Sequence, residues 1–401
     1  NVQGEMILSV NAEISSRPNS NYGYATISED TTTPTYDSSE GQFIKISGNV
    51  SAKDYTTKLE GGKIYYLHFG YHKSTSTSSA DYTDIFRINN VNIETSGELL
   101  AIQKGITNVG ELTISDGARI NVSSAKDAYG IYNTGKLEVT GGLIQASSKN
   151  EDINIYGIYN DSLEELNFKN GRILIESEYY GRTYGIYNIN IGKINMLGGN
   201  INLLISSGAG ISYGIYSIEG EVNLIQGNIY YSATYRLGNA SVYGIYTDMA
   251  RINIEELGKI DLDCKGSSYG VYTRTGDVYI NGGNISSYSD RFSSYGIYVN
   301  DTANLYINKG FIQASKSSNS SAYGIYNKNT GTINITDGII NCLTLDSSGS
   351  NEAYGIYNSS GIINMISGKI SVESLEGVSV SYAYGIYNLF KGKTFVGVND
   401  N

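Results

Sequence analysis

The sequence predicts an all-β protein, a right-handed parallel β-helix of about 11 coils with a small β-sandwich-like cap at its N-terminal end. The main observation is the tetrapeptide Tyr-Gly-Ile-Tyr, which first occurs at residues 129–132 and returns nine times, once with Val271 in place of Ile. Consecutive copies begin 26 to 31 residues apart. A motif that returns at a nearly fixed step of this size is typical of a solenoid, in which each repeat forms one turn.

Three short strands are expected in each coil. In the coil that begins at Tyr129, three apolar alternations are separated by turns, one of them a Gly-Gly pair. Side chains alternate between the faces of a strand, so Leu137 and Val139 are expected to point into the coil and to stack on matching residues about 4.8 Å away in the next coil. No coil has the three-and-four spacing of an amphipathic helix. Because the connections are too short for a crossover helix, we expect parallel ladders with right-handed winding.

Two domains are predicted, a β-rich cap over residues 1–95 and the repeat domain over residues 96–401. Residues 1–95 lack the motif and contain period-two stretches separated by polar loops, a pattern that indicates antiparallel strands. A cap at this end would cover the edge of the first coil, which otherwise is open to pairing with other chains. A degenerate copy of the motif at residues 105–108 is interpreted as the first coil.

Composition restricts the classes of partner and location. The formal net charge of −11 argues against nucleic acid or an anionic bilayer, since both are bound through clustered Lys and Arg. No apolar run reaches the roughly 18 residues that a membrane span needs. The chain begins with Asn rather than Met and is interpreted as a mature or trimmed form of an exported protein. Cys264 and Cys342 are predicted to be buried free thiols, three coils apart and too distant for a disulfide.

The second tyrosine of each motif is the main candidate for contact with a ligand or partner. If Ile131 points inward, Tyr129 lies at an inner corner and Tyr132 points outward, unless a bulge reverses this phase. A column of aromatic faces suits sugar rings or a partner surface, but stacked tyrosines also stiffen and cover a sheet, and the absence of Trp favours that structural interpretation. The ten candidate residues are Tyr132, Tyr159, Tyr187, Tyr216, Tyr246, Tyr272, Tyr298, Tyr326, Tyr357 and Tyr387.

An asparagine follows the motif in six coils. Asn tolerates the left-handed conformation of a tight corner, and stacked side-chain amides can hydrogen-bond to one another. A structural role is therefore favoured over a polar binding stripe. The six residues are Asn133, Asn160, Asn188, Asn327, Asn358 and Asn388.

Catalytic chemistry is not expected. Parallel β-helices that cleave polysaccharides need clustered carboxylates, whereas Asp and Glu are scattered along this chain and form no dense acidic patch beside a basic residue. Asp261 and Asp263 share the outward phase of one strand, but nothing in neighbouring coils converges on them. His68 and His72 lie in the cap without a third ligand nearby. We therefore expect no catalytic residues, no metal site and no cofactor.

The repeat resembles a known architecture. Tyr-Gly-Ile-Tyr-Asn, an Ile-x-Ile pair and Gly-Gly-x-Ile follow one another in most coils between about residues 90 and 390. This order resembles the right-handed parallel β-helix repeats of large, adhesin-like proteins of the bacterial cell surface. The resemblance implies the fold and a cell-surface location. It implies no site, because that family is defined by its repeat.

The expected function is that of a secreted structural or adhesive surface protein. A rigid rod would display a tyrosine-bearing face and the variable returns at residues 178–182, 230–239 and 345–352, since loops on a rigid scaffold often carry recognition. The expected partner is a glycan or a protein of a host or cell surface, and copies could associate end to end into a filament or layer. The alternative is a carbohydrate-binding or polysaccharide-degrading β-helix, including the tail-spike type.

Overall fold

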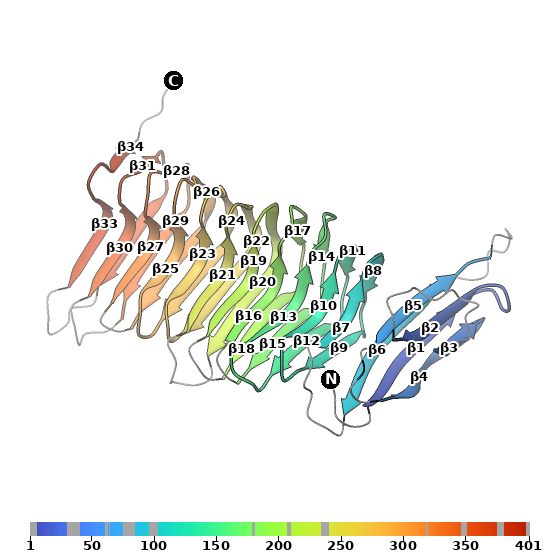
Figure 1. Cartoon of the computed structure of the whole chain (residues 1–401). Coiled ribbons are helices and arrows are strands. Elements are labelled where there is room, and N and C mark those ends of the chain that lie inside the picture. The colour runs from blue at the N-terminus through green and yellow to red at the C-terminus, as the bar shows by residue number, and fades with distance from the viewer. Residues whose placement is uncertain are drawn as a thin grey trace.

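The computed structural model describes residues 6–29, 41–60, 63, 65–74, 85–95, 103–178, 181–206, 210–233, 240–317, 320–345, 351–374 and 381–397. These residues form strands and turns and no helix, so nothing in this part of the chain is a helical membrane span. The strands stack side by side into an elongated solenoid, with a second group of strands at its N-terminal end (Figure 1). The prediction of a stacked β-solenoid is confirmed.

One wall of the solenoid is a parallel sheet of eleven strands that contains every copy of the motif. Successive copies pair in register, from Tyr129 opposite Tyr156 to Tyr354 opposite Tyr384. Eleven strands are joined by ten circuits of chain, so the described solenoid has about ten complete turns, close to the predicted number. The strands are β7 (Gln103–Asn108), β10 (Ala128–Asn133), β13 (Ile153–Asn160), β16 (Gly181–Asn188), β19 (Ile211–Ser217), β21 (Ser241–Thr247), β23 (Ser268–Thr273), β25 (Ser294–Val299), β27 (Ser321–Asn327), β30 (Glu352–Asn358) and β33 (Tyr382–Asn388).

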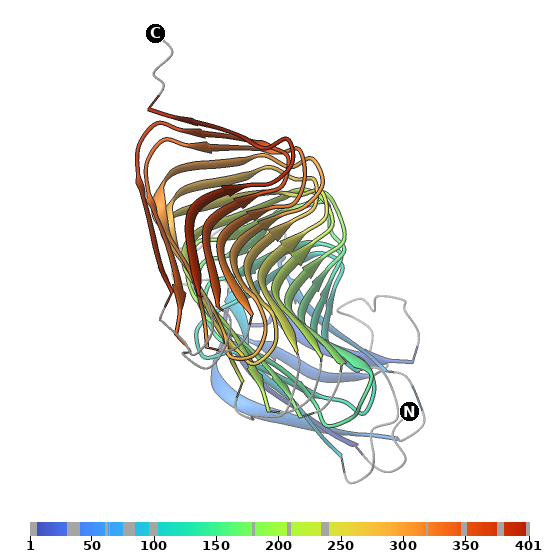
Figure 2. The same cartoon turned by 90° about the vertical axis from the view of Figure 1, so that its left-hand side faces the viewer.

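The rest of each coil belongs to a second, larger sheet. The next strand of the coil pairs in parallel with its counterparts above and below, and so does the one after it. The coils follow one another with the same outline when seen from the C-terminal end (Figure 2). The first set is β8 (Glu111–Ile114), β11 (Lys136–Val139), β14 (Leu166–Phe168), β17 (Lys193–Met196), β28 (Thr332–Ile335), β31 (Ile362–Met365) and β34 (Lys393–Val396). The second set is β9 (Arg119–Ser123), β12 (Leu143–Ser148), β15 (Arg172–Ser177), β18 (Asn200–Ile205), β29 (Ile339–Thr344) and β32 (Lys369–Ser374).

In the middle of the solenoid these two strands are continuous. The sequence analysis expected a corner between them in every coil, but four coils replace the corner with a bulge, seen as a shift of pairing register between Leu224 and Gln226. The bulge keeps both halves of the strand hydrogen-bonded to the neighbouring coils. The continuous strands are β20 (Glu221–Ala233), β22 (Arg251–Cys264), β24 (Val278–Ser289) and β26 (Leu305–Lys316).

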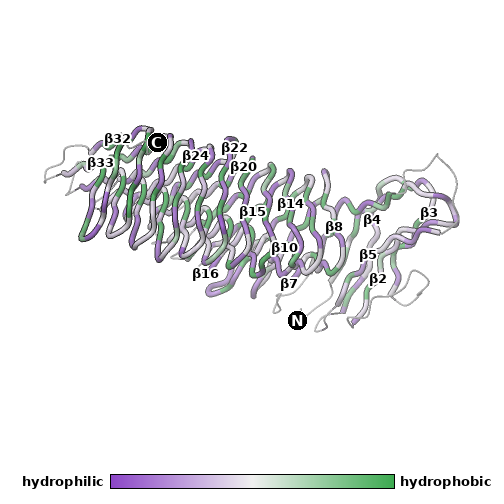
Figure 3. Tube along the Cα trace, turned by 90° about the horizontal axis from the view of Figure 1, so that it is seen from above, coloured by the Kyte–Doolittle hydropathy of each residue, from purple (hydrophilic) through white to green (hydrophobic). Residues whose placement is uncertain are grey.

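The core runs along the axis of the solenoid and is built from stacked apolar residues. Leu137 and Val139 point inward as predicted, with 0% and 1% of their surface exposed. Polar and apolar residues alternate along each coil in bands that continue across neighbouring coils (Figure 3). Cys264 and Cys342 are buried free thiols, as predicted. Burial raises the pKa of each thiol to about 12, which makes both thiols poor nucleophiles.

The N-terminal strands form two antiparallel layers. Strand β1 (Met6–Ser15) pairs with β4 (Asn49–Leu59) and β6 (Ile85–Thr95), and β2 (Tyr22–Ser28) pairs with β3 (Gln42–Ser47) and β5 (Tyr66–His72). Residues of both layers, among them Val10, Ala25 and Ile44, share one buried cluster. A short parallel pairing of β6 with β9 places Val91 opposite Ile120. The cap therefore extends the larger sheet past the first coil.

Candidate functional site

Both tyrosines of each motif lie on the outside of the solenoid. In β10 the position where Gly130 would carry a Cβ atom faces inward, and so does the side chain of the next residue, Ile131. The alternation of a regular strand therefore breaks between these two residues. A Cβ atom on Gly130 would lie 2.6 Å from Ile144 Cγ2 and 2.5 Å from the carbonyl oxygen of Gly157, so only glycine fits. The prediction that Tyr129 lies at an inner corner is therefore wrong, whereas the outward position of Tyr132 is confirmed.

The outward tyrosines form two continuous columns, which together we call the tyrosine ladder. Ring centroids within the first column are 4.6–5.1 Å apart and nearly parallel. Those within the second column are 4.7–5.3 Å apart. Between columns the rings meet edge to face, as Tyr243 and Tyr246 do at 90°. The first column is Tyr129, Tyr156, Tyr184, Tyr213, Tyr243, Tyr269, Tyr295, Tyr323, Tyr354 and Tyr384, and the second is the set of ten candidate residues named above.

This packing determines what the ladder can bind. The two faces of an interior ring are covered by the rings of the coils before and after it, so a sugar ring cannot stack on them. Ring edges and hydroxyl groups remain accessible. Burial raises the pKa of Tyr184 to about 12, and burial together with the charge of Asp127 does the same for Tyr129. The ladder thus presents rows of neutral phenol groups, which donate and accept hydrogen bonds.

A lysine covers the N-terminal end of the ladder. Lys104 occupies the motif position in the degenerate first coil and pairs in register with Tyr129. Its Nζ lies 3.5 Å from the ring centroid of Tyr132, a cation–π contact, and burial lowers its pKa. The sequence analysis missed this residue, although its position one coil before Tyr129 was visible in the repeat.

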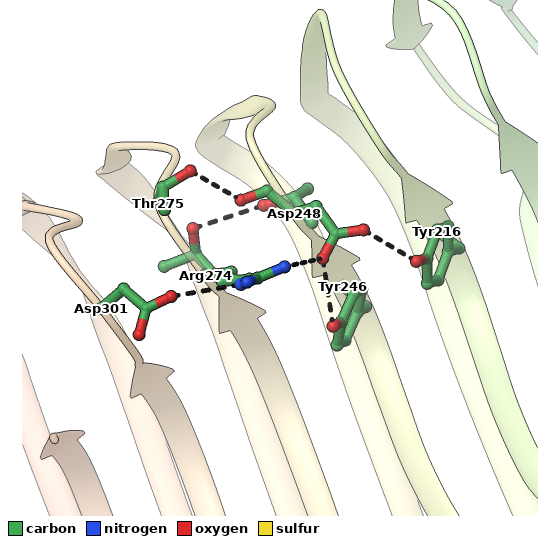
Figure 4. A network of polar contacts seen from close by, with 8 residues as sticks. Tyr216, Tyr246, Asp248, Arg274, Thr275 and Asp301 are labelled. Atoms are coloured by element: carbon green, nitrogen blue, oxygen red, sulfur yellow. Dashed lines mark hydrogen bonds and ion pairs between the residues drawn. The ribbon is translucent and has the colours of Figure 1, made fainter.

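A polar network lies at the rim of the ladder, where the chain turns out of β21 (Figure 4). The hydroxyl of Tyr216 donates a hydrogen bond to Asp248 Oδ2 at 2.9 Å, and that of Tyr246 donates to Asp248 Oδ1 at 3.3 Å. Thr275, one coil further on, donates through its hydroxyl to the carbonyl oxygen of Asp248 at 2.9 Å. Asp248 therefore joins turns and tyrosines of three successive coils, through its carboxylate to Tyr216 and Tyr246 and through its backbone carbonyl oxygen to Thr275.

Arg274 extends this network to a second carboxylate. Its Nε donates to Asp301 Oδ2 at 3.1 Å, and its guanidinium lies 4.0 Å from Asp248 Oδ1. The Arg274 side chain is 58% exposed and faces solvent beside the tyrosine hydroxyls. No dense acidic patch beside a basic residue was expected, and this smaller cluster of two carboxylates and one guanidinium was not foreseen. It forms because a step of one coil brings residues some 27 positions apart together at the same turn.

The asparagine column forms a buried ladder of its own. Asn108 Nδ2 donates to Asn133 Oδ1 at 2.7 Å, Asn133 to Asn160 at 2.6 Å and Asn160 to Asn188 at 2.7 Å. The predicted stacking of amides is thus confirmed. The predicted left-handed backbone is wrong, because the described non-glycine residues with positive φ are Asn19, Asp152 and Phe390, none of which belongs to the column. Asn is suited to this corner because its inward amide also bonds the turn, as Asn133 Nδ2 does with the carbonyl of Gly135 at 2.7 Å.

A second asparagine ladder lies on the outer face of the larger sheet. Asn195 Nδ2 donates to Asn167 Oδ1 at 2.9 Å, Asn223 to Asn195 at 2.9 Å and Asn253 to Asn223 at 2.6 Å. The sequence analysis missed this ladder. The signal was an Asn between two inward apolar residues in consecutive coils, as in Ile-Asn-Met and Val-Asn-Leu.

The remaining candidate residues do not converge on a site. Asp261 and Asp263 point outward as predicted, and burial raises the pKa of Asp263. His68 Nε2 lies 3.2 Å from Ser28 Oγ in the cap. No group of three metal-ligating side chains occurs within the described ranges. Parts of the variable returns, at residues 179–180, 234–239 and 346–350, lie outside the described residues.

Comparison with known proteins adds no family to this description. No family model, no curated protein and no solved structure matches the chain. The ladders, the rim network and the sequence are therefore the basis for any functional proposal.

Proposed function

We propose that this protein is an extracellular structural and adhesive protein of the bacterial cell surface, in which a rigid β-solenoid displays its tyrosine ladder and turn loops to a partner. The repeat pattern of the sequence supports the assignment to the adhesin-like class. The partner is a glycan or a surface protein, and copies of the rod associate end to end into a filament or layer.

The tyrosine ladder supports this proposal most strongly. Twenty tyrosines of ten consecutive motif copies pack in two columns over one wall, and each ring is held by its neighbours. Aromatic pairs in such geometry contribute about 0.5–1.5 kcal/mol each beyond the burial of area. A wall of this kind is stiff and regular over its whole length. These properties suit a spacer that holds a binding surface away from a cell, and they are not needed for a single catalytic pocket.

Contact with the partner takes place through hydroxyl groups and ring edges. Tyr246 and Tyr272 lie in the second column beside the exposed Arg274, where phenol, guanidinium and carboxylate groups face solvent together. Such a mixture of polar groups beside aromatic edges matches both a polyhydroxy ligand and the polar rim of a protein interface.

A test of adhesion uses the removal of single hydroxyl groups. The double variant Tyr246→Phe/Tyr272→Phe keeps the rings and removes two hydroxyls, so it should weaken binding to cell or glycan surfaces and leave folding intact. The matched control is Tyr279→Phe/Tyr306→Phe, which alters a separate two-ring stack on the larger sheet, with centroids 4.6 Å apart. Equal binding by the wild type and both variants in a glycan array and a cell-adhesion assay would show that the hydroxyl groups of the ladder do not contribute to binding.

The rim network supports a second candidate function, carbohydrate binding. Asp248 and Asp301 flank Arg274, and planar guanidinium and carboxylate groups are suited to paired hydrogen bonds with sugar hydroxyls. Arg274→Gln should then abolish glycan binding, whereas Arg251→Gln, at a cation on the larger sheet 5.0 Å from the Tyr279 ring, should not. Reducing-sugar release from a polysaccharide panel tests cleavage directly.

End-to-end association is tested separately. Size-exclusion chromatography and electron microscopy over a range of concentrations should show assemblies that lengthen along one axis. Monomers alone at high concentration would contradict the filament.

A further inference from the structure

Lys316 is a buried lysine in a column of small residues. It ends β26 with 0% of its surface exposed. The residues in register with it in neighbouring coils are Cys264, Ser289, Thr344 and Ser374. The column thus places a primary amine among small side chains in the interior of the solenoid.

The side chain of Asn351 is the hydrogen-bond acceptor of this lysine. Lys316 Nζ donates a hydrogen bond to Asn351 Oδ1 at 2.9 Å, and Asn351 is also 0% exposed. With a C=O length of about 1.23 Å, a hydrogen bond of this length places Nζ about 3–4 Å from the amide carbon. Reacting atoms in a near-attack arrangement are about 3–3.5 Å apart. An amine and a carboxamide are thus held together where water is excluded.

We propose that Lys316 and Asn351 form an intramolecular isopeptide bond. The bond between Nζ and Cγ of Asn351 forms, and the bond between Cγ and Nδ2 breaks. Two protons pass from the lysine ammonium to Nδ2, which leaves as ammonium. The step needs no oxidant, reductant or other co-reactant.

The surroundings favour the product. The new amide is neutral, and the ammonium that is released passes to solvent, where its dilution opposes the reverse reaction. Exclusion of water from both side chains also disfavours hydrolysis of the amide. The bond joins residues 35 positions apart, which belong to successive coils, and closes the chain across the corner between β26 and β30. Like a disulfide, it would restrict the unfolded chain and stabilise the rod.

The mass of the intact protein tests this inference. The full chain, purified without chemical modification, should be lighter than its sequence mass by one molecule of ammonia. A tryptic digest should contain one branched peptide in which the Lys316 and Asn351 segments are joined, with no cleavage after Lys316. A wild-type mass equal to the sequence mass would overturn the proposal.

Matched variants exclude other losses of ammonia. In Lys316→Arg the mass loss should disappear, because the guanidinium keeps the charge and lacks the primary amine. A succinimide formed at an asparagine would persist in this variant, and persistence would therefore also overturn the proposal. The control Lys259→Arg, at an exposed position of β22, should retain the loss. The outcome does not depend on the proposed adhesive function.

Discussion

The same five residues, Tyr-Gly-Ile-Tyr-Asn, occur in an interior coil at β16 and in the last described coil at β33, and their surroundings differ. Ile186 and Asn188 in β16 are 0% exposed, whereas Ile386 is partly exposed and Asn388 is exposed. A Cβ on Gly185 would lie 2.3 Å from Ile201 Cγ2, whereas one on Gly385 would meet nothing within 4 Å. The inward residues of a motif copy are therefore buried only when a further coil packs over them. This is why a single repeat cannot fold alone.

The largest expected difference between the two coils comes from removing the inward isoleucine. Ile186→Ala should lower the free energy of unfolding by about 2–5 kcal/mol, because it leaves a cavity in a closely packed stack. Ile386→Ala should cost much less, since the site is open. Urea titration of both variants checks this, and equal losses would show that burial at β33 had been completed in another way.

Adding a methyl group at the glycine should also separate the coils. Gly185→Ala should lower the free energy of unfolding by about 1–3 kcal/mol, because the new Cβ overlaps Ile201 and the carbonyl oxygen of Gly214 at 2.5 Å. Gly385→Ala should be nearly neutral. If Gly185→Ala were also neutral in the same titration, the inward position of the glycine would be wrong.

Removing an amide tests the buried asparagine ladder. Asn188→Ala deprives Asn160 Nδ2 of its acceptor, at 2.7 Å, and should cost about 1–3 kcal/mol for the buried groups left unpaired. Asn388→Ala should cost less, because water replaces the lost partner at the exposed end. Thermal unfolding of the pair, followed by circular dichroism, measures the difference. Equal losses of stability in the two variants would show that the corner of β16 is in contact with solvent.

Alkaline pH should weaken interior coils through the tyrosine ladder. The pKa of Tyr184 is raised to about 12, above the ordinary value of about 10 of an unfolded chain. The folded state therefore binds the phenol proton more tightly, so this contribution is complete below pH 10 and is lost as pH rises towards 12. Unfolding midpoints and phenolate absorbance should change together above pH 10. Ionisation of all tyrosines near pH 10 without unfolding would contradict the covered ladder.

Much of the architecture follows from the repeat. Its spacing predicts parallel stacking, and alternation predicts inward residues such as Leu137, Cys264 and Cys342. Alternation fails at Gly130 and Ile131, which are adjacent and both inward. The reason is Ile144, fourteen residues later on another wall, whose side chain fills the space above the glycine. No local pattern contains that contact.

The candidate site was less predictable than the fold. The outward position of Tyr132 follows from strand phase, but the covering of ring faces depends on the match of ring spacing to coil spacing. The rim network consists of turn residues, namely Asp248, Arg274 and Asp301. Because turns vary between coils, the proximity of these side chains could be predicted only once the pairing register of the strands was known. The pairing of Lys316 with Asn351 crosses a corner and follows no periodicity.

The central claim is that each motif copy lies directly beside the next, one circuit of chain later. Glu138 and Asn167 are in-register partners on β11 and β14, and Asn195 is one coil further. Disulfide trapping measures this directly, because a disulfide requires Cα atoms within about 7 Å. Glu138→Cys/Asn167→Cys should cross-link rapidly under mild oxidation, and Glu138→Cys/Asn195→Cys should not. Cross-linking of the second pair, or of neither, would contradict the stacked solenoid.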